Sequence, residues 1–189
     1  DDGLLGKNLH NNHWNQDRPD GRYVCPHAFI GKLADGSIAT YQTLPWERRG
    51  WHAGGFANDT HIGFEICEAK LTDGAYFNVA YKEAVALCVY LCKLYSLNEK
   101  NIIGHYEGYK LGIATNHADP GHWFPKHGKS MDAFRADVQN ALDSFAASAE
   151  RQKKLYRVQV GAYSLKANAE AQLARAKAAG FPDAYIKYD

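Results

Sequence analysis

The strongest constraint on the fold is a pair of strand-like runs, residues 27–33 and 37–44, separated by only three residues. The connection contains Asp35-Gly36, and an Asp-Gly pair between such runs is a strong signal for a β-hairpin. A third strand is predicted at residues 60–67, where apolar residues alternate with others. The polar segment 1–24 before them is expected to be a loop. The chain is therefore expected to contain a sheet.

Helical spacing of apolar residues appears after these strands. Residues 78–95 and about 130–144 each carry an apolar stripe, and Ser130 is expected to cap the second helix. A short buried strand is predicted at 102–104, ending at His105, with a long loop through 129. Near the C-terminus, the pattern predicts a β-α-β unit: a strand at 156–163, a helix at 167–179 ended by Gly180, and a strand at 184–188.

Charge divides the chain into two parts. Residues 151–189 carry a net charge of +5, whereas the rest carries −4. We expect a main domain at 1–145, a small and charged linker or helical tail at 146–155, and a separate unit at 156–189. The overall net charge of +1 argues against nucleic acid as a partner. The longest apolar run, residues 84–92, is too short to cross a membrane, which takes about 20 residues.

The chain has four cysteines, Cys25, Cys67, Cys88 and Cys92, with no close CxxC pair. Two close pairs are typical of structural zinc sites, so we do not expect one here. Burial as small apolar residues is the preferred interpretation. The chain starts at Asp1 without an initiator Met and without a signal-peptide pattern, which indicates a processed or clipped N-terminus.

The strongest candidate for chemistry is His105 together with Asp119, fourteen residues later. Imidazole nitrogen and carboxylate oxygen both suit Zn²⁺, and a catalytic zinc takes three protein ligands and keeps one open position. His117 lies two residues before Asp119 and could stabilise a developing oxyanion. The alternative is a surface histidine and an aspartate that opens a turn.

Glu65 stands in the middle of the third predicted strand. A carboxylate on a strand beside a metal can act as general base toward water. The alternative is a solvated polar face of a half-buried sheet.

The loop after the hairpin combines Trp51 and His52 with a glycine pair. Glycines let a backbone approach a ligand closely, and an aromatic ring can stack on sugar or peptide. A packed structural loop is the alternative. His27 and His61 are expected to be structural or to support ligand residues, and not to be ligands themselves. The candidate substrate-binding residues are Trp51, His52, Ala53, Gly54 and Asn58.

Residues 25 to about 135 resemble the zinc N-acetylmuramoyl-L-alanine amidases of the type 2 amidase and peptidoglycan-recognition-protein superfamily. The resemblance rests on the order and spacing of four stretches, 27–44, 49–55, 60–68 and 104–121. Residues 156–188, beginning Tyr-Arg-Val-Gln-Val-Gly-Ala-Tyr-Ser, resemble half of a SPOR-type repeat, a module associated with glycan strands of peptidoglycan.

The resemblance implies an α/β (α+β) fold with a mixed central sheet flanked by helices and one zinc ion at the floor of a groove. It implies His105 and Asp119 as two zinc ligands, Glu65 as the carboxylate that assists water, and His117 at the oxyanion position. The family's first zinc histidine lies on a strand that would precede Asp1. We therefore expect the N-terminal strand to be missing. His10 and His13 are candidates to replace its ligand.

The implied reaction is hydrolysis of the amide bond between N-acetylmuramic acid and L-alanine in peptidoglycan. The alternative is a peptidoglycan-binding module without catalysis, because the first zinc ligand is absent. Arg157, Gln159 and Tyr163 are the candidate glycan contacts of the tail. We expect a monomer that is secreted or bound to the cell wall, or a phage endolysin released through a holin.

Overall fold

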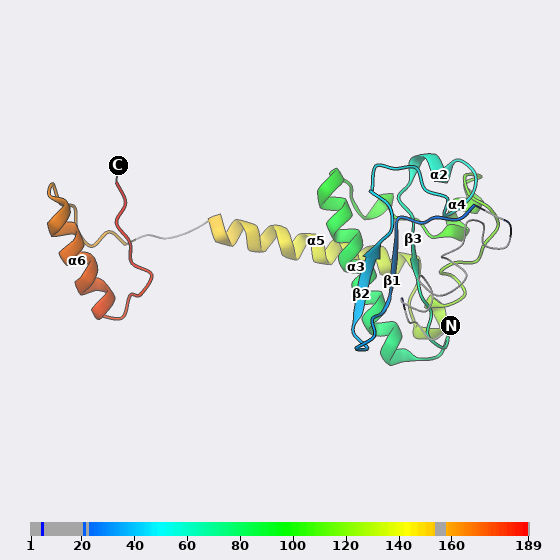
Figure 1. The fold of residues 1–189 in the computed structure, drawn as a ribbon, viewed down its shortest axis with the longest axis horizontal. Helices are drawn as coiled ribbons and strands as arrows, with labels where there is room; N and C mark the ends of the chain where they lie inside the picture. The colour runs from blue at the N-terminus through cyan, green and yellow to red at the C-terminus, as the bar shows by residue number, and fades with distance from the viewer. Residues whose placement is uncertain (1–4, 6–20, 22, 154–157, 189) are drawn as a thin grey trace. The chain divides into compact units, whose positions relative to one another are not determined.

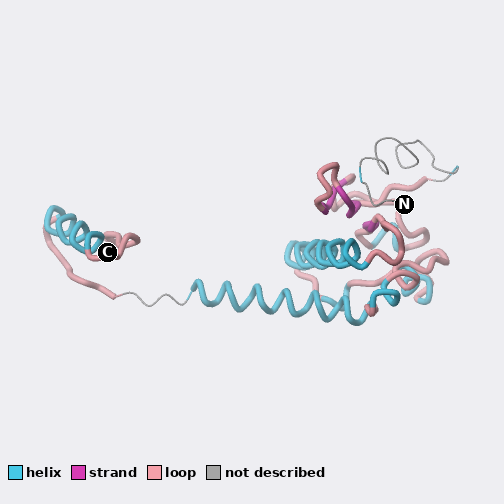
Figure 2. The backbone as a smooth tube through the Cα atoms, turned by 90° about the horizontal axis from the view of Figure 1, so that it is seen from below, coloured by secondary structure: helices cyan, strands magenta, loops and turns pink. Residues whose placement is uncertain are grey.

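The computed structural model describes residues 5, 21, 23–153 and 158–188 (Figures 1 and 2). The chain divides into two compact units, Asp1–Ala146 and Ala147–Asp189, which are considered separately below. No helix in the described ranges is both long and apolar enough for a membrane span.

The first unit is built on a mixed sheet of three strands in the order β2-β1-β3. Strand β1 (Ala28–Lys32) pairs antiparallel with β2 (Ile38–Gln42) and parallel with β3 (Phe64–Ile66). The predicted hairpin is confirmed. Its turn is stabilised by Asp35 Oδ1, which accepts from the Ser37 backbone N–H at 2.9 Å. Because β1 has one antiparallel and one parallel neighbour, the predicted mixed sheet of an α+β fold is confirmed as well.

One long helix, α3 (Gly74–Tyr95), packs against β1 and β2 and forms the core with them (Figure 1). It begins where Asp73 accepts from the Tyr76 N–H, a standard N-cap. Its inward face includes Phe77, whose ring meets Trp123 edge-on at 5.0 Å between centroids. The core therefore depends on aromatic packing between α3 and the segment that follows the candidate site.

Among the described residues, the other helices up to residue 153 are short, apart from α5, which continues past the end of the first unit at Ala146. They are α2 (Ala57–Thr60), the 3-10 turn η2 (Glu99–Asn101), α4 (His105–Lys110), the 3-10 turn η3 (Phe124–His127) and α5 (Met131–Lys153). Helix α5 continues past the predicted end near 144, so residues 146–153 of the expected linker are helical.

The four cysteines are free thiols. Cys67, Cys88 and Cys92 are buried, as predicted, and Cys25 is half-buried.

The strand predicted at residues 102–104 is not formed. Its backbone groups find other partners: Ile102 N–H donates to the Glu99 carbonyl, and the Ile102 carbonyl accepts from Arg135 at 3.0 Å. The Gly104 N–H donates to the Glu107 carboxylate at 2.8 Å. Because these groups are satisfied without a ladder, His105 does not end a strand but begins α4.

Arg135 of α5 and Glu107 of α4 hold this arrangement together. Two guanidinium nitrogens of Arg135 donate to the two Glu107 oxygens at 2.9 and 3.0 Å. The pairing is bidentate, the strong form of an ion pair. Burial opposes ionisation of Glu107, but its hydrogen bonds from Arg135 and Gly104 outweigh it and lower its pKa.

The second unit contains helix α6 (Lys166–Ala178), which confirms the predicted helix. The two strands predicted beside it are not formed among the described residues 158–188. Their apolar side chains remain in solvent, with Val158 at 86% and Tyr188 at 70% exposure. A strand needs a ladder partner and an apolar layer, and these residues have neither within the described part of this unit.

We predict that Glu107→Gln lowers the free energy of unfolding by about 1–3 kcal/mol at pH 7, because it removes a charge-assisted pair. The folded pKa of Glu107 is lowered, so its contribution is present at neutral pH and lost as pH falls through that pKa. Urea unfolding of both proteins should therefore differ at pH 7 and converge in acid.

The matched control is Asp143→Asn, which alters an exposed contact with Gln139 on α5. This variant should change stability by no more than about 0.5 kcal/mol. Equal losses from the two variants, or a loss at Glu107 that does not depend on pH, would contradict this account.

Candidate active site

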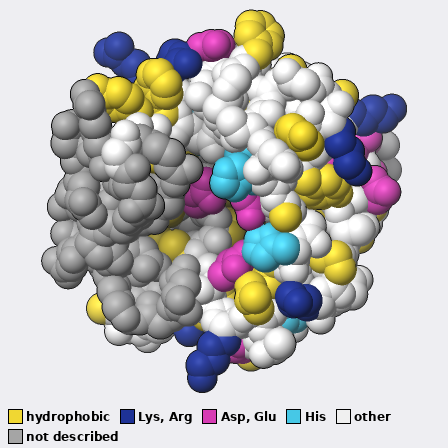
Figure 3. Space-filling model, turned by 90° about the vertical axis from the view of Figure 1, so that its right-hand side faces the viewer, with side chains coloured by type: hydrophobic (Ala, Val, Ile, Leu, Met, Phe, Trp, Pro, Cys, Tyr) yellow, Lys and Arg dark blue, Asp and Glu magenta, His cyan; other side chains and the backbone are white. Residues whose placement is uncertain are grey.

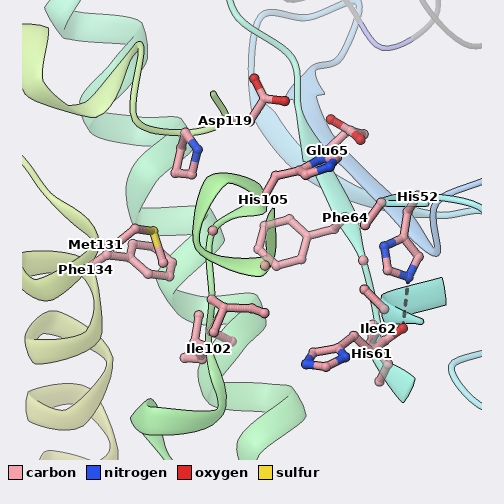
Figure 4. A pocket seen from close by; sticks show the side chains of 18 of the residues that line it. His52, His61, Ile62, Phe64, Glu65, Ile102, His105, Asp119, Met131 and Phe134 are labelled. Carbon is pink, nitrogen blue, oxygen red and sulfur yellow. Dashed lines mark hydrogen bonds between the residues drawn. The ribbon is translucent and has the colours of Figure 1, made fainter. Parts of the chain in front are cut away.

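A pocket of about 560 Å³ lies along β3 in the first unit. Figure 3 shows histidine and acidic side chains around a hollow on this face. At one end of the pocket are Glu65, His105 and Asp119, and another part is lined by Ile102, Met131 and Phe134 (Figure 4). Three residues that the sequence singled out for chemistry therefore line one cavity.

Glu65 is the most perturbed acid of this pocket. It sits at the centre of β3, paired in register with Phe29 of β1. Burial raises its pKa to about 7, and the nearby carboxylates of Asp119 and Glu68 add to the shift. Glu65 lines the pocket and is half-buried, so it does not lie on a fully solvated face. A carboxyl with this pKa can take or give a proton near neutral pH.

His105, His117 and Asp119 form a group at the mouth. The His105 and His117 rings lie 4.7 Å apart between centroids, and His117 Nδ1 lies 3.9 Å from Asp119 Oδ2. Burial and the neighbouring His117 lower the pKa of His105, against the opposing effect of Asp119. These effects favour the neutral form of His105, which has a nitrogen lone pair to offer.

The segments carrying His105 and Asp119 are joined through the backbone. The Tyr106 N–H donates to the Asp119 carbonyl at 3.2 Å. At Gly104 the packing is close, since a Cβ there would lie 2.8 Å from Pro120. The start of α4 and the loop that returns to Asp119 therefore fit together as they do because this position is glycine.

Sequence reasoning missed two polar residues of the site, Glu68 and His122. His122 Nε2 lies 2.6 Å from Glu68 Oε1, and its Nδ1 lies 3.3 Å from Asp119 Oδ1. His122 therefore stands between two carboxylates. Glu68 follows Glu65 by three positions, and His122 follows Asp119 by three positions. This spacing from two residues already selected is the feature of the sequence that could have identified them.

The loop containing Trp51 and His52 is held from beneath by Asn58. The Asn58 side-chain oxygen accepts from the backbone N–H groups of His52 and Ala53 at 2.9 and 3.0 Å. Asn58 is only 4% exposed, so it supports the loop and its side chain does not face the pocket. His52 and Ala53 do line the pocket.

His52 is locked against the end of α2. Its Nε2 donates to the His61 carbonyl at 2.9 Å, and burial lowers its pKa to about 4, so the ring is neutral. A Cβ at Gly63 would lie 2.2 Å from this ring, which explains the glycine in the strand run. His52 is therefore a fixed wall of the pocket.

Trp51 is 46% exposed. The Arg49 guanidinium lies 4.1 Å from its ring centroid and Tyr23 lies 5.7 Å away. The ring of Trp51 thus remains accessible despite these contacts.

Gly54, in the same loop, has a positive φ of +69°.

Of the two histidines interpreted as structural, His27 is buried, contacts the Arg48 carbonyl through Nε2 at 2.8 Å, and accepts from the Gly63 N–H at 3.1 Å. His61 contacts Thr60 through Nδ1 at 2.8 Å and lines the pocket. His10, His13 and Arg157 lie outside the described residues.

The site offers donors of the right chemistry for zinc, but too few in the described part of the chain. His105 and Asp119 are an imidazole and a carboxylate, as zinc prefers. Within the described ranges, however, no three histidine, cysteine or acidic side chains converge as a metal centre requires. These residues therefore do not make a complete zinc centre by themselves.

Comparison of the chain with known protein families and structures identifies the class of protein. A family model described as N-acetylmuramoyl-L-alanine amidase matches residues 4–122, and one described as SPOR domain matches residues 130–188. The first covers more than half of the chain, so this chain belongs to the N-acetylmuramoyl-L-alanine amidase family, with a C-terminal SPOR domain. The SPOR match includes α5 and begins well before the expected residue 156.

Two individual proteins are similar to this chain. A "Probable N-acetylmuramoyl-L-alanine amidase" of Bacillus licheniformis is 34% identical over 86 residues, which are 46% of this chain and 22% of the relative. The chain thus spans less than a quarter of that relative. The crystal structure of Staphylococcus aureus hydrolase AmiA in complex with its ligand has a TM-score of 0.57 and 21% identity, covering 75% of this chain and 65% of that chain. This second match supports the fold.

We predict that Asn58→Ala destabilises the first unit by about 1–3 kcal/mol, because two backbone donors lose a buried acceptor. The exposed Asn140→Ala on α5 is the control and should cost nothing measurable. Thermal unfolding measures both, and hydrogen exchange of the His52 and Ala53 amides should accelerate only in Asn58→Ala. Unchanged protection of these two amides would refute the supporting role.

Proposed function

We propose that this chain hydrolyses the amide bond between N-acetylmuramic acid and the L-alanine of the stem peptide in peptidoglycan. The observation that carries the proposal is Glu65, a half-buried carboxyl whose pKa desolvation raises to about 7, in one pocket with His105 and Asp119. An acid with a pKa raised in this way, beside an electron-pair donor in a cleft, marks a candidate functional site. The family assignment supports the same reaction.

In this proposal, Glu65 removes a proton from the attacking water and later returns it to the leaving amine. His117, at the mouth of the pocket, donates a hydrogen bond to the oxygen that becomes negative. His105 and Asp119 contribute two ligands of a zinc ion. When bound, zinc would act as a Lewis acid toward the amide carbonyl.

The substrate would lie along the rim formed by residues 51–54. Trp51 offers an exposed ring for stacking, while His52, Ala53 and Gly54 present a rigid edge. Asn58 would contribute indirectly, since it holds the backbone of this edge.

The SPOR domain would hold the enzyme on its polymer. Gln159 and Tyr163 are exposed in the second unit and, with Arg157, are the proposed glycan contacts. Because both domains would act on one polymer, we propose a cell-wall-associated protein, with peptidoglycan and not nucleic acid as partner, acting as a monomer. Secretion or release as a phage lysin are both compatible with this role.

A second function is favoured by the donor count of the described residues: a recognition module that binds peptidoglycan without cleaving it. Zinc content separates the two. The hydrolase predicts about one zinc per purified chain, a loss of amidase activity with chelator, and recovery with zinc. Binding to peptidoglycan without zinc or cleavage would favour the recognition module.

We predict that Glu65→Gln lowers kcat about 10²–10⁴-fold with little change in stability, because the amide fills the same space but takes no proton. For the unchanged protein, kcat/KM should fall as pH decreases, because the base must be ionised. The midpoint should be at or below about 7, since a bound cation favours the carboxylate.

The control is Glu83→Gln, a carboxylate on α3 that accepts from Thr40 outside the pocket. It should retain full activity and the same pH profile. If Glu65→Gln is as active as the unchanged protein on soluble muropeptides, Glu65 is not the base.

We predict that removing residues 158–189 weakens retention on purified sacculi while leaving cleavage of soluble muropeptides within about twofold, because the second unit carries no part of the pocket. Tyr163→Ala should reproduce part of this loss, and Tyr90→Ala, at an exposed tyrosine of α3, should not. Equal retention of full-length and shortened chains in a sedimentation assay would show that the tail does not bind.

A further inference from the structure

Thr115 joins the two segments that border the mouth of the pocket. Its backbone N–H and its hydroxyl both donate to the Ala53 carbonyl, each at 2.8 Å. Its Oγ1 also lies 3.2 Å from His105 Nε2. We propose that Thr115 is a positioning residue that fixes one neutral tautomer of His105, with the proton on Nε2 and the Nδ1 lone pair free.

The tautomer of His105 follows from the number of protons available at these contacts. A threonine hydroxyl has one proton to donate and lone pairs to accept with, whereas a backbone carbonyl only accepts. The contact between Oγ1 and Ala53 therefore uses the hydroxyl proton. In the contact between Oγ1 and His105, the proton must then come from Nε2–H. A neutral imidazole carries one N–H, so Nδ1 is left as an acceptor.

Space for this contact is provided by Gly54. A Cβ at Gly54 would lie 2.5 Å from Thr115 Cγ2, and the φ of +69° at Gly54 is one that other residues adopt at a cost. The lack of a side chain at Gly54 therefore leaves room for the threonine methyl. Thr115 therefore connects the loop of residues 51–54 to His105 through hydrogen bonds.

The tautomer determines which ring nitrogen of His105 can bind a ligand. Partners of this kind commonly set the tautomer of a functional histidine and its orientation. With Nε2–H engaged, Nδ1 is the atom that can bind a cation or accept a hydrogen bond. Only this last step rests on the proposed function, because the tautomer is a property of the chain itself.

The test is the tautomer of His105, measured by long-range ¹H–¹⁵N correlation on the full, metal-free chain at neutral pH. His105→Gln assigns the signals. The unchanged protein should show a single tautomer with protonated Nε2, Thr115→Ser should preserve it, and Thr115→Val should give a mixture. Thr43→Val removes a different hydroxyl-to-carbonyl bond, to Pro26, and should leave His105 unchanged.

A protonated Nδ1 in the unchanged protein, or the same single tautomer in Thr115→Val, would overturn the proposal. Thr115→Ala provides a second variant if the valine disturbs the loop. On muropeptides, Thr115→Val should lower kcat about 10–100-fold at similar KM, with recovery in Thr115→Ser. If the tautomers behave as expected but the unchanged protein cleaves no amide, the proposed function fails and the role of Thr115 stands.

Discussion

The candidate site depends on the ion pair between Arg135 and Glu107. Arg135 reaches from α5 to the Glu107 carboxylate and to the Ile102 carbonyl, and Glu107 in turn accepts from the Gly104 N–H. These contacts hold residues 102–104 extended and start α4 at His105. A helix of six residues is marginal by itself, so its position comes from such tertiary contacts. The orientation of His105 is thus set by α5, thirty residues further along the chain.

Three carboxyl groups, those of Glu65, Glu68 and Asp119, line the same pocket, and the pKa of Glu65 is raised to about 7. Asp119 and Glu68 lie on either side of His122, and both raise the pKa of the half-buried Glu65. Desolvation makes a charge on Glu65 costly, and the charges of Asp119 and Glu68 add to that cost. The same crowding makes the pocket attractive to a cation and keeps Glu65 ready for proton transfer near neutral pH.

Local patterns predicted the hairpin, α3 and the helix of the tail, because turn residues and apolar periodicity act within a few residues. They also selected Glu65, His105 and Asp119, which do line one pocket. They failed at residues 102–104, where Arg135 and Glu107 replace the ladder partners of a strand, and at the strands beside α6. Asn58 was chosen as a substrate contact, yet its side chain is buried beneath the loop. At residues 102–104 the deciding partner, Arg135, is about thirty residues away in the sequence, and a local pattern does not reveal it.

The central claim is that the pocket containing Glu65 cleaves one particular bond. Mass spectrometry of purified peptidoglycan digested by the full chain with zinc identifies that bond directly. The account predicts free stem peptides that begin with L-alanine, together with glycan strands whose lactyl groups end in a carboxylate, and no such products from Glu65→Gln. New reducing ends, cleavage within the stem peptide, or no cleavage by the zinc-loaded chain would contradict it.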